Sequence, residues 1–393
     1  MRSQRGIPLW RDVRVWQAAA QLALVVAIVA LVATLWSNLT YNLWDLGIQQ
    51  GFGFLDSEAS FPIGETPIPY DPSDSYRRAL LVGFVNFLRA IAVGIPLATV
   101  VGVTIGIARL SSNWLVRQLA SIYVEVLRNL PLLLQLLFWY ALLSVGLPEL
   151  ENRLALPGQV YLSNQGIVLP WFATTPSTLL WLAIAVPSSA IALGLTRWQA
   201  HRRLRLGQPP LPWLAGPIAV VGVMAIAVIV SGAIAGHAPL QGSLPKLSTE
   251  LQWQGGLELS SEFLALLLGL SLYTAAFIAE IVRGGIQAVP KGQWEAAQSL
   301  GLNRGLTLRL VVLPQAFRAI LPPLTNQYLN LSKNSSLAIA VGYPDFYSVA
   351  STTASQRSQT VELVLLILVT YLLVSLAISG VMNAANWLLR KRY

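Results

Sequence analysis

The sequence predicts an all-α, polytopic membrane protein with about eight transmembrane helices. Of its 393 residues, 55% are hydrophobic and only 11% are charged, and the mean hydropathy is +0.60. The apolar residues gather in runs of about twenty, the length that crosses a bilayer core of about 30 Å. The formal net charge of +9 lies in short clusters between these runs, as at cytoplasmic membrane flanks. This composition argues against a soluble protein of several domains.

These apolar runs are assigned as spans. In chain order they cover residues 18–36, 80–108, 119–145, 177–195, 213–235, 262–282, 320–341 and 361–389. Arginines precede the first run, which is long enough to remain as a membrane anchor. The alternative, a cleaved signal peptide, has a shorter apolar region of about 7 to 15 residues.

The connections between the runs are polar. Residues 38–79 carry six acids and are assigned to the outside, either as a folded cap or as a linker lying on the membrane surface. Residues 148–176, 236–261 and 342–359 are the other external loops. Four arginines within 197–205 indicate a cytoplasmic loop or an anionic-lipid contact rather than a nucleic-acid site.

The distribution of basic residues gives the orientation. The segments assigned to the cytoplasm hold 18 lysines and arginines, whereas the external segments hold five. Basic residues are retained on the cytoplasmic side, so this bias predicts that both termini lie in the cytoplasm. The connection at 283–318 then lies inside the cell as well.

Charged side chains inside the runs need partners, because lipid does not solvate them. Arg89 lies about a third of the way into the second run, and its long side chain is expected to reach the outer interface rather than line a path. Glu125 and Arg128 are three residues apart on one helical face, so they are expected to pair with each other. Lys333 of the seventh run can pair with Glu280 of the sixth.

The connection after the sixth run contains the most distinctive stretch of the chain. Apolar sequence ends at Val282, and Pro290 stands where a new helix can begin. Nearly every residue from 291 to 300 favours helix, and Gly301 follows where glycine commonly ends one. A short polar helix frays in isolation. It is therefore expected to dock on another protein, with an ordinary connecting loop as the alternative.

Four motifs in this half of the chain carry a resemblance to a known family. They are AEIVRGGI at 279–286, EAA at 295–297 followed by Gly301, LPQAFR at 313–318 and LSKNSSL at 331–337. These motifs resemble those of permease subunits of ABC importers, in the branch that carries polar amino acids. The stretch RNLPLL at 128–133 is similar to the RGTPLL of that branch but departs from it at its second and third residues.

The resemblance implies the type I ABC importer fold with a five-helix core. The core spans are those near 80, 119, 264, 320 and 361, which leaves the first span and the pair at 177–235 as three additional helices. This enlarged pattern resembles one subunit of general L-amino acid importers, in which two different permeases pair. The expected parts are an N-terminal span and external loop at 1–79, a first part of the core at 80–147, external loops with an inserted helix pair at 148–261, and the rest of the core with the coupling helix at 262–393.

The resemblance also implies partners. The helix carrying Trp294, Glu295, Ala296 and Ala297, and ending at Gly301, is expected to seat on a dimer of ATP-binding subunits that bind ATP and Mg. This chain is expected to be no enzyme and to hold no cofactor or metal, since it has no GxxxxGK[ST] loop, no cysteine and two histidines. The other expected partners are a second, different permease, a periplasmic amino acid-binding protein and the lipid of the inner membrane. Nucleic acid is not expected.

Polar residues in and after the seventh run form a candidate substrate path. Gln327, Asn330 and Asn334 are spaced by three and four, so they share one helical face, and Lys333 and Ser335 lie beside them. Amides can bind both ends of a zwitterionic amino acid, and the lysine can attract its carboxylate. The alternative, hydrogen bonds between helices or to the partner permease, stays open. Related importers have an acid at the place of Asn334, so the sequence does not support a cationic substrate.

Two other functions compete with an ATP-driven importer. A secondary transporter driven by an ion gradient would show internal repeats and acids at mid-membrane, and the sequence has no clear repeat and few such acids. A membrane partner of a sensor that transports nothing would not need the helix at 291–300.

Overall fold

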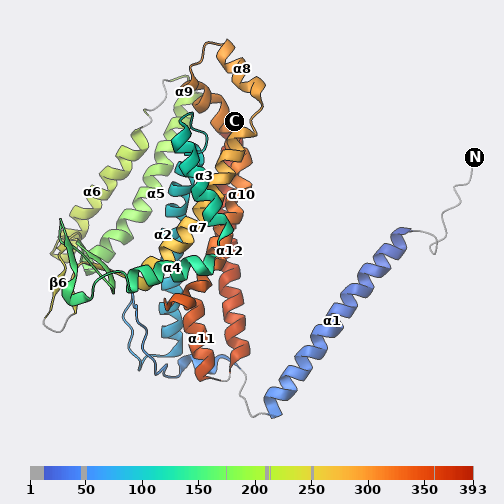
Figure 1. The fold of residues 1–393 in the computed structure, drawn as a ribbon, viewed down its shortest axis with the longest axis vertical. Helices are drawn as coiled ribbons and strands as arrows, with labels where there is room; N and C mark the ends of the chain where they lie inside the picture. Colours follow the sequence, from blue (N-terminus) through green and yellow to red (C-terminus); the bar gives the residue numbers. More distant parts are fainter. Residues whose placement is uncertain are drawn as a thin grey trace, which may run out of the picture. The chain divides into compact units, whose positions relative to one another are not determined.

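The chain is built mainly of helices (Figure 1). The computed structural model describes residues 13–392 apart from 46–50, 174, 209–211, 213, 249–251 and 358. The helices are α1 Val13–Asp45, α2 Tyr76–Ala108, α3 Trp114–Asn129, α4 Leu132–Ser144, α5 Pro176–Arg205, α6 Ala215–Ala235, α7 Ser261–Gln287, α8 Lys291–Ser299, α9 Arg304–Thr307, α10 Leu313–Asn334, α11 Phe346–Gln356 and α12 Thr360–Arg392. Described residues of 1–89 and 344–385 form one compact unit, and those of 90–343 and 386–393 form the other.

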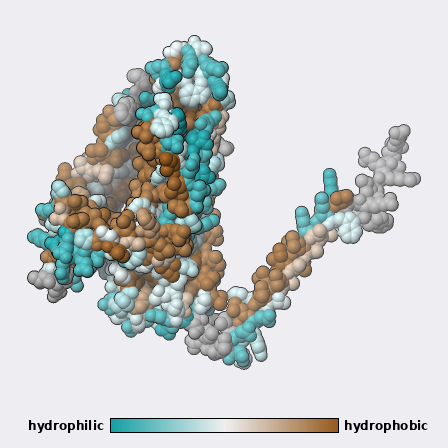
Figure 2. Space-filling view, viewed as in Figure 1, coloured by the Kyte–Doolittle hydropathy of each residue, from teal (hydrophilic) through white to brown (hydrophobic). Residues whose placement is uncertain are grey.

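Six of the described helices, α1, α2, α5, α6, α7 and α12, are long and apolar enough to cross a membrane. The pair α3 and α4 makes up to seven if it is one bent span. In α1, apolar side chains cover the middle and hydrophilic ones lie at both ends (Figure 2). The predicted class, all-α and polytopic, is confirmed. The run predicted at 320–341 lies in α10 and the following 3-10 helix η5 (Ser335–Val341), where prolines and amides interrupt the apolar sequence.

The third predicted span is not one straight helix. The axes of α3 and α4 are bent by 107° around Pro131. Proline has no amide proton for a bond to the preceding turn, so the helix ends there. The side-chain amide of Gln135 donates to the backbone oxygens of Leu127 (2.9 Å) and Leu130 (3.1 Å), which satisfies carbonyls left open at the break.

Arg128 and Arg89, which lie inside the predicted spans, have partners in the structure that the sequence did not predict. Glu125 and Arg128 do not pair; the guanidinium of Arg128 lies 5.0 Å from the ring centroid of Phe277 in α7 instead. The electron-rich face of the ring stabilises the cation in place of a carboxylate. Arg89 pairs with Glu65, which belongs to the segment predicted to be external. That Arg89 reaches the outer interface stays a prediction.

The segment ahead of α2 is folded onto the start of that helix. It contains a short 3-10 helix, η2 (Phe52–Asp56). Phe54 and Phe61 are buried, with ring centroids 6.1 and 6.3 Å from that of Tyr76. Of the two forms expected for residues 38–79, the described part after residue 50 is a folded segment rather than an open linker.

The loops predicted at 148–176 and 236–261 meet in small antiparallel sheets. One sheet has the order β1 (Leu154–Leu156), β2 (Val160–Ser163), β3 (Gly166–Leu169) and β8 (Leu257–Ser260). Two further pairs are β4 (Trp171–Phe172) with β5 (Gly242–Ser243), and β6 (Lys246–Leu247) with β7 (Trp253–Gln254). β8 runs directly into α7, whose first turn is capped by the side chain of Ser260. The inserted helix pair α5 and α6 lies between these loops in the chain.

In the unit of residues 90–343, α2 and α7 approach closely because of two glycines four residues apart. A Cβ on Gly102 would lie 2.6 Å from the Cβ of Ile278, and one on Gly106 would lie 2.7 Å from the backbone oxygen of Ala279. Small residues at this spacing let two membrane helices pack backbone to backbone. The contact holds the last turns of α2 against the part of α7 that leads to α8.

The core of the same unit joins α4, α7 and η5. Leu136, Leu266, Leu270 and Tyr343 are buried in one cluster. In a bilayer the surrounding lipid is as apolar as these side chains, so the cluster stabilises the fold through close packing rather than through the removal of water.

The predicted loop at 342–359 contains a helix, α11. Its N-cap is Asp345, whose carboxylate accepts from the backbone amide of Ser348 (2.9 Å) and from the hydroxyl of Tyr371 in α12 (3.4 Å). Asp345 is fully buried. Burial disfavours its charged form and raises its pKa to about 7.

Replacing Asp345 by asparagine is expected to flatten the pH dependence of stability. The unfolded chain releases this proton near pH 4 and the folded chain near pH 7, so stability falls as pH rises between these values. Each unit of difference between the folded and unfolded pKa values corresponds to about 1.4 kcal/mol of stability. Asparagine cannot ionise and still caps the helix. The variant should therefore gain stability over the parent at pH 8 and little at pH 4, measured as thermal unfolding midpoints in detergent. Equal slopes in both proteins would contradict the assignment.

Candidate functional site

The helix predicted at 291–300 is present as α8, which ends one residue earlier. It ends in a Schellman motif, in which the amide of Leu302 donates to the oxygen of Ala297 (3.1 Å) and the amide of Gly301 donates to that of Gln298 (2.9 Å). The φ angle of Gly301 is +76°, the left-handed conformation that this motif requires. The prediction that Gly301 ends the helix is confirmed.

α8 has one face against the protein and one face away from it. Ala297 is buried and Trp294 is half-buried where α8 contacts α9 and the π-helix η4 (Leu308–Val312). Glu295 and Ala296 are exposed. Hydrophilic side chains gather over α8 in Figure 2. Of the five residues predicted for this helix, Trp294 and Ala297 therefore fix it on the protein. Glu295, Ala296 and Gly301 remain accessible.

The chain beyond α8 continues through η4 into α10. A π-helix has wider turns than an α-helix and often occurs at functional sites. Pro314 follows η4 and has no amide proton to continue an α-helical ladder. Gln315 donates to the side chain of Gln293 in α8 (3.2 Å) and to the backbone oxygen of Val311 (3.0 Å). These bonds tie α8 to the first turn of α10.

Exposed apolar side chains also occur at the end of α8 and in the segment that follows it, and no motif in the sequence pointed to them. Leu300, at the end of α8, is 81% exposed, and Leu306, Leu310 and Phe317 are exposed as well. The available signal was a leucine directly before the glycine that ends a polar helix. Exposed apolar groups rimmed by polar ones are typical of protein contacts.

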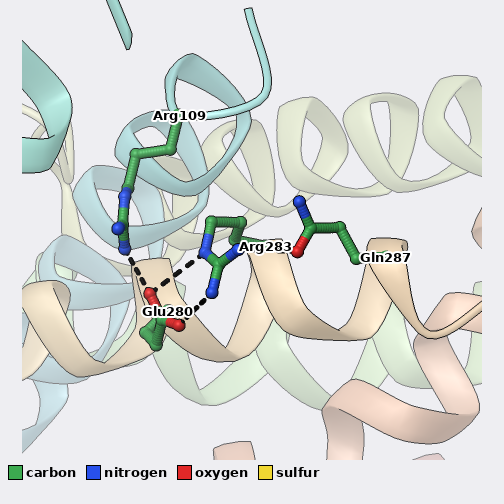
Figure 3. A network of polar contacts seen from close by, with 4 residues as sticks. All are labelled: Arg109, Glu280, Arg283 and Gln287. Carbon is green, nitrogen blue, oxygen red and sulfur yellow. Dashed lines mark hydrogen bonds and ion pairs between the residues drawn. The ribbon is translucent and has the colours of Figure 1, made fainter. Parts of the chain in front are cut away.

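A polar network joins the end of α2 to the end of α7 (Figure 3). Glu280 lies between Arg109 and Arg283 and accepts hydrogen bonds from both. Arg283 also donates to the side chain of Gln287 (2.6 Å), in the last turn of α7. Of the two roles given for Lys333, pairing with Glu280 is wrong, because Glu280 pairs with the two arginines instead. The network lies just before α8 in the chain.

The polar face predicted on α10 is present, and most of its side chains are not bonded to the rest of the chain. Asn330 and Lys333 are exposed, and Gln327 and Asn334 are half-buried. None of these four side chains forms a hydrogen bond to any other residue that the structure describes. Bonding between helices of this chain, one of the alternatives, is therefore not observed. Exposed amides and an ammonium are costly against lipid, so this face requires a path or a polar partner.

Ser335 does not belong with that face. It is buried, and its hydroxyl donates to the backbone oxygen of Ser332 (2.8 Å), one turn back. On the protein side of α10, the hydroxyl of Tyr328 lies 2.8 Å from that of Thr99 in α2. This bond fixes α10 against α2, and the sequence analysis missed it because the two residues are far apart in the chain. Within the described ranges, no group of three His, Asp or Glu side chains is placed to hold a metal ion.

Comparison with known proteins identifies the family of this chain. Residues 94–391 match the family described as "Binding-protein-dependent transport system inner membrane component". The chain is 44% identical to AapQ of Rhizobium johnstonii, a general L-amino acid transport system permease protein, over 92% of this chain and 90% of that one. It is 42% identical to YhdX of Escherichia coli, named as an amino-acid ABC transporter permease protein, over 95% and 93% of the two chains.

A third relative, BztB of Rhodobacter capsulatus, is a glutamate/glutamine/aspartate/asparagine transport system permease protein that is 37% identical over 95% of this chain and 94% of its own. The family is one of transport permeases of the inner membrane, and the several membrane-length apolar helices in the described part of this chain agree with a multi-pass protein of that membrane. The chain belongs to this family and is a membrane-spanning permease subunit of an ABC importer.

Proposed function

We propose that this permease carries amino acids into the cytoplasm, together with a second, different permease, two ATP-binding subunits and a periplasmic amino acid-binding protein. The relatives that match it over nine tenths of both chains are amino acid permeases. The family description itself names a binding-protein-dependent system. Both termini lie in the cytoplasm in this proposal, which the excess of basic residues in the segments on that side supports.

α8 is the element that couples transport to ATP in this proposal. The sequence has no GxxxxGK[ST] loop, so ATP and Mg are bound by the partner subunits. The observation that carries the proposal is the accessible surface of α8, with Glu295 and Ala296 on its outer face and Leu300 exposed at its end. When ATP closes the partner pair, α8 moves with it. The network around Glu280 then passes that movement to α2 and α7 together.

The substrate path runs along the polar face of α10. Gln327, Asn330 and Asn334 supply donors and acceptors for a zwitterion, and Lys333 attracts its carboxylate. The support for this role is that these side chains have no bonding partner among the described residues although they belong to the predicted seventh span. The transport core comprises 80–147 and 262–393, and the parts at 1–79 and 148–261 are additions to it.

Co-purification and reconstitution test the proposed assembly. A tagged chain extracted from its native membrane is expected to bring an ATP-binding subunit and a second permease, and the complex in liposomes is expected to import labelled amino acids with the binding protein and ATP. A chain that co-purifies with no nucleotide-hydrolysing subunit would overturn the proposal. Uptake driven by an ion gradient without ATP would support the secondary transporter instead.

Replacing Asn330 by alanine is expected to raise the apparent KM for amino acid uptake. A lost neutral hydrogen bond costs about 0.5–1.5 kcal/mol, which is roughly two- to twelvefold in affinity. Asn383→Ala is the matched control, since Asn383 is also an exposed amide of a membrane helix but lies in α12. Initial uptake rates over a range of substrate concentrations give both constants. An unchanged KM in the Asn330 variant would remove this residue from the path.

A further inference from the structure

A groove of about 720 Å³ lies in the unit formed by residues 1–89 and 344–385. The first turns of α2 form one wall and α12 forms the other, with Phe346 of α11 and Phe84 of α2 in edge-to-face contact at 6.2 Å. Leu80 and Phe346 are buried, whereas Leu81 and Leu373 are exposed at the rim. The lining of the groove is thus mostly apolar, and its rim side chains Leu81 and Leu373 are exposed.

Two arginines line the groove at the start of α2. They are Arg77 and Arg78 in the first turn of that helix, which contains no acidic residue. Arg78 uses its Nε and one Nη to donate to the backbone oxygen of Pro69 (2.9 and 2.6 Å), so its guanidinium is held in place with its other Nη unused by that contact. Arg77 pairs with Asp56 at 2.7 Å, but the two side chains are 68% and 69% exposed. Such an exposed pair is weak and can exchange partners.

We propose that this groove binds a glycerophospholipid, with its phosphate between Arg77 and Arg78 and an acyl chain along the groove. Arginine guanidinium binds phosphate through parallel hydrogen bonds, and the N-terminus of α2 adds a favourable dipole. A transmembrane helix such as α1, which ends in Asp45, is the competing occupant, and the crosslinking experiment below distinguishes the two. The phospholipid satisfies both ends.

The dimensions of the groove suit this occupant. Arg77 and Phe84 are seven residues apart on α2, and Leu366 and Val374, which line the opposite wall, are eight apart on α12. At 1.5 Å per residue both walls extend about 10–12 Å, within the half-thickness of about 15 Å for the hydrocarbon core. The two guanidinium groups lie at the start of α2, a candidate span, so in this proposal they are at the level of the lipid phosphates.

Photo-crosslinking in native membranes tests this site. With the photoreactive residue p-benzoylphenylalanine in place of Leu373, irradiation is expected to add the mass of a phospholipid to the protein in several-fold higher yield than with the same residue at Leu372. Leu372 is equally exposed on α12 but does not line the groove. Because both positions meet bulk lipid, only the excess yield at Leu373 reports the groove.

Two charge variants in the Leu373 background separate a phosphate contact from a general effect. Arg77→Gln is expected to lower the lipid adduct roughly two- to fivefold, the range of an exposed charge pair. Asp56→Asn breaks the same ion pair but keeps the guanidinium, so its yield should not fall. A crosslink to residues 13–45 or to another polypeptide, equal yields at Leu373 and Leu372, or an equal loss in both charge variants would each overturn the proposal.

Discussion

Replacing Gly301 by valine is expected to abolish ATP-driven uptake while the chain remains in the membrane at its normal level. The φ of +76° at this position is costly for any residue with a Cβ, by about 1–2 kcal/mol, and more so for a β-branched one. Relief of that strain opens the Schellman motif and displaces Leu300 with the end of α8. Uptake of labelled amino acid, normalised to the amount of protein in the membrane, measures the effect.

Two variants separate backbone strain from other causes. Asparagine tolerates the left-handed conformation, so Gly301→Asn is expected to retain most of the uptake. Gly292→Ala lies within α8, where a Cβ meets no atom within 4 Å and alanine favours the helix. A Cβ at Gly301 also meets no atom of this chain within 4 Å. If Gly301→Asn lowers uptake as much as Gly301→Val does, glycine is required by the docked partner rather than by the backbone. Full uptake by the valine variant would refute the coupling role of α8.

Replacing Glu280 by glutamine is expected to destabilise the protein and to impair uptake together. Arg109 and Arg283 lose their shared counter-charge, and the side chain of Arg109 is only 14% exposed. Breaking a buried pair costs about 3–5 kcal/mol, and partial exposure here reduces this to about 1–3 kcal/mol. The midpoint of denaturant unfolding in detergent measures the loss.

A double-mutant cycle with Arg109→Met assigns that loss to the contact. The two changes together should cost less than their sum by about 1 kcal/mol or more, because either one alone already breaks the pair. Glu125→Gln is the matched control, since Glu125 is an exposed acid of a neighbouring helix and forms no ion pair with the described residues. Its effect should stay within about 0.5 kcal/mol. Strict additivity of Glu280→Gln and Arg109→Met would show that the two residues act independently.

Local signals explain what could be predicted from the sequence. The start and end of α8 depend on Pro290 and Gly301, whose backbone preferences act within a few residues. The spans depend on apolar content alone. The strands of the external sheets are two to four residues long, which is too short for an alternating pattern to stand out, so they were assigned as loops.

The remaining features depend on contacts between distant parts of the chain. The pair Arg109 and Glu280 joins residues 171 positions apart, and nothing near either residue favours it over Lys333.

The bend at Pro131 was hidden for another reason. Membrane helices tolerate proline when the freed carbonyls find other donors, and Pro96 and Pro187 lie inside helices that continue through them. A proline alone therefore does not reveal which helix breaks.

The pairing of β3 with β8 has a consequence for how such a chain can be lengthened or shortened. Leu169 stands directly opposite Leu257 in adjacent antiparallel strands, so their backbones are only about 5 Å apart. The chain between these two residues, which includes α5 and α6, therefore leaves the sheet and re-enters it at adjacent positions. A two-residue hairpin turn spans the same gap. We therefore expect that the segment holding this helix pair can be replaced by a short turn without moving the first residue of α7.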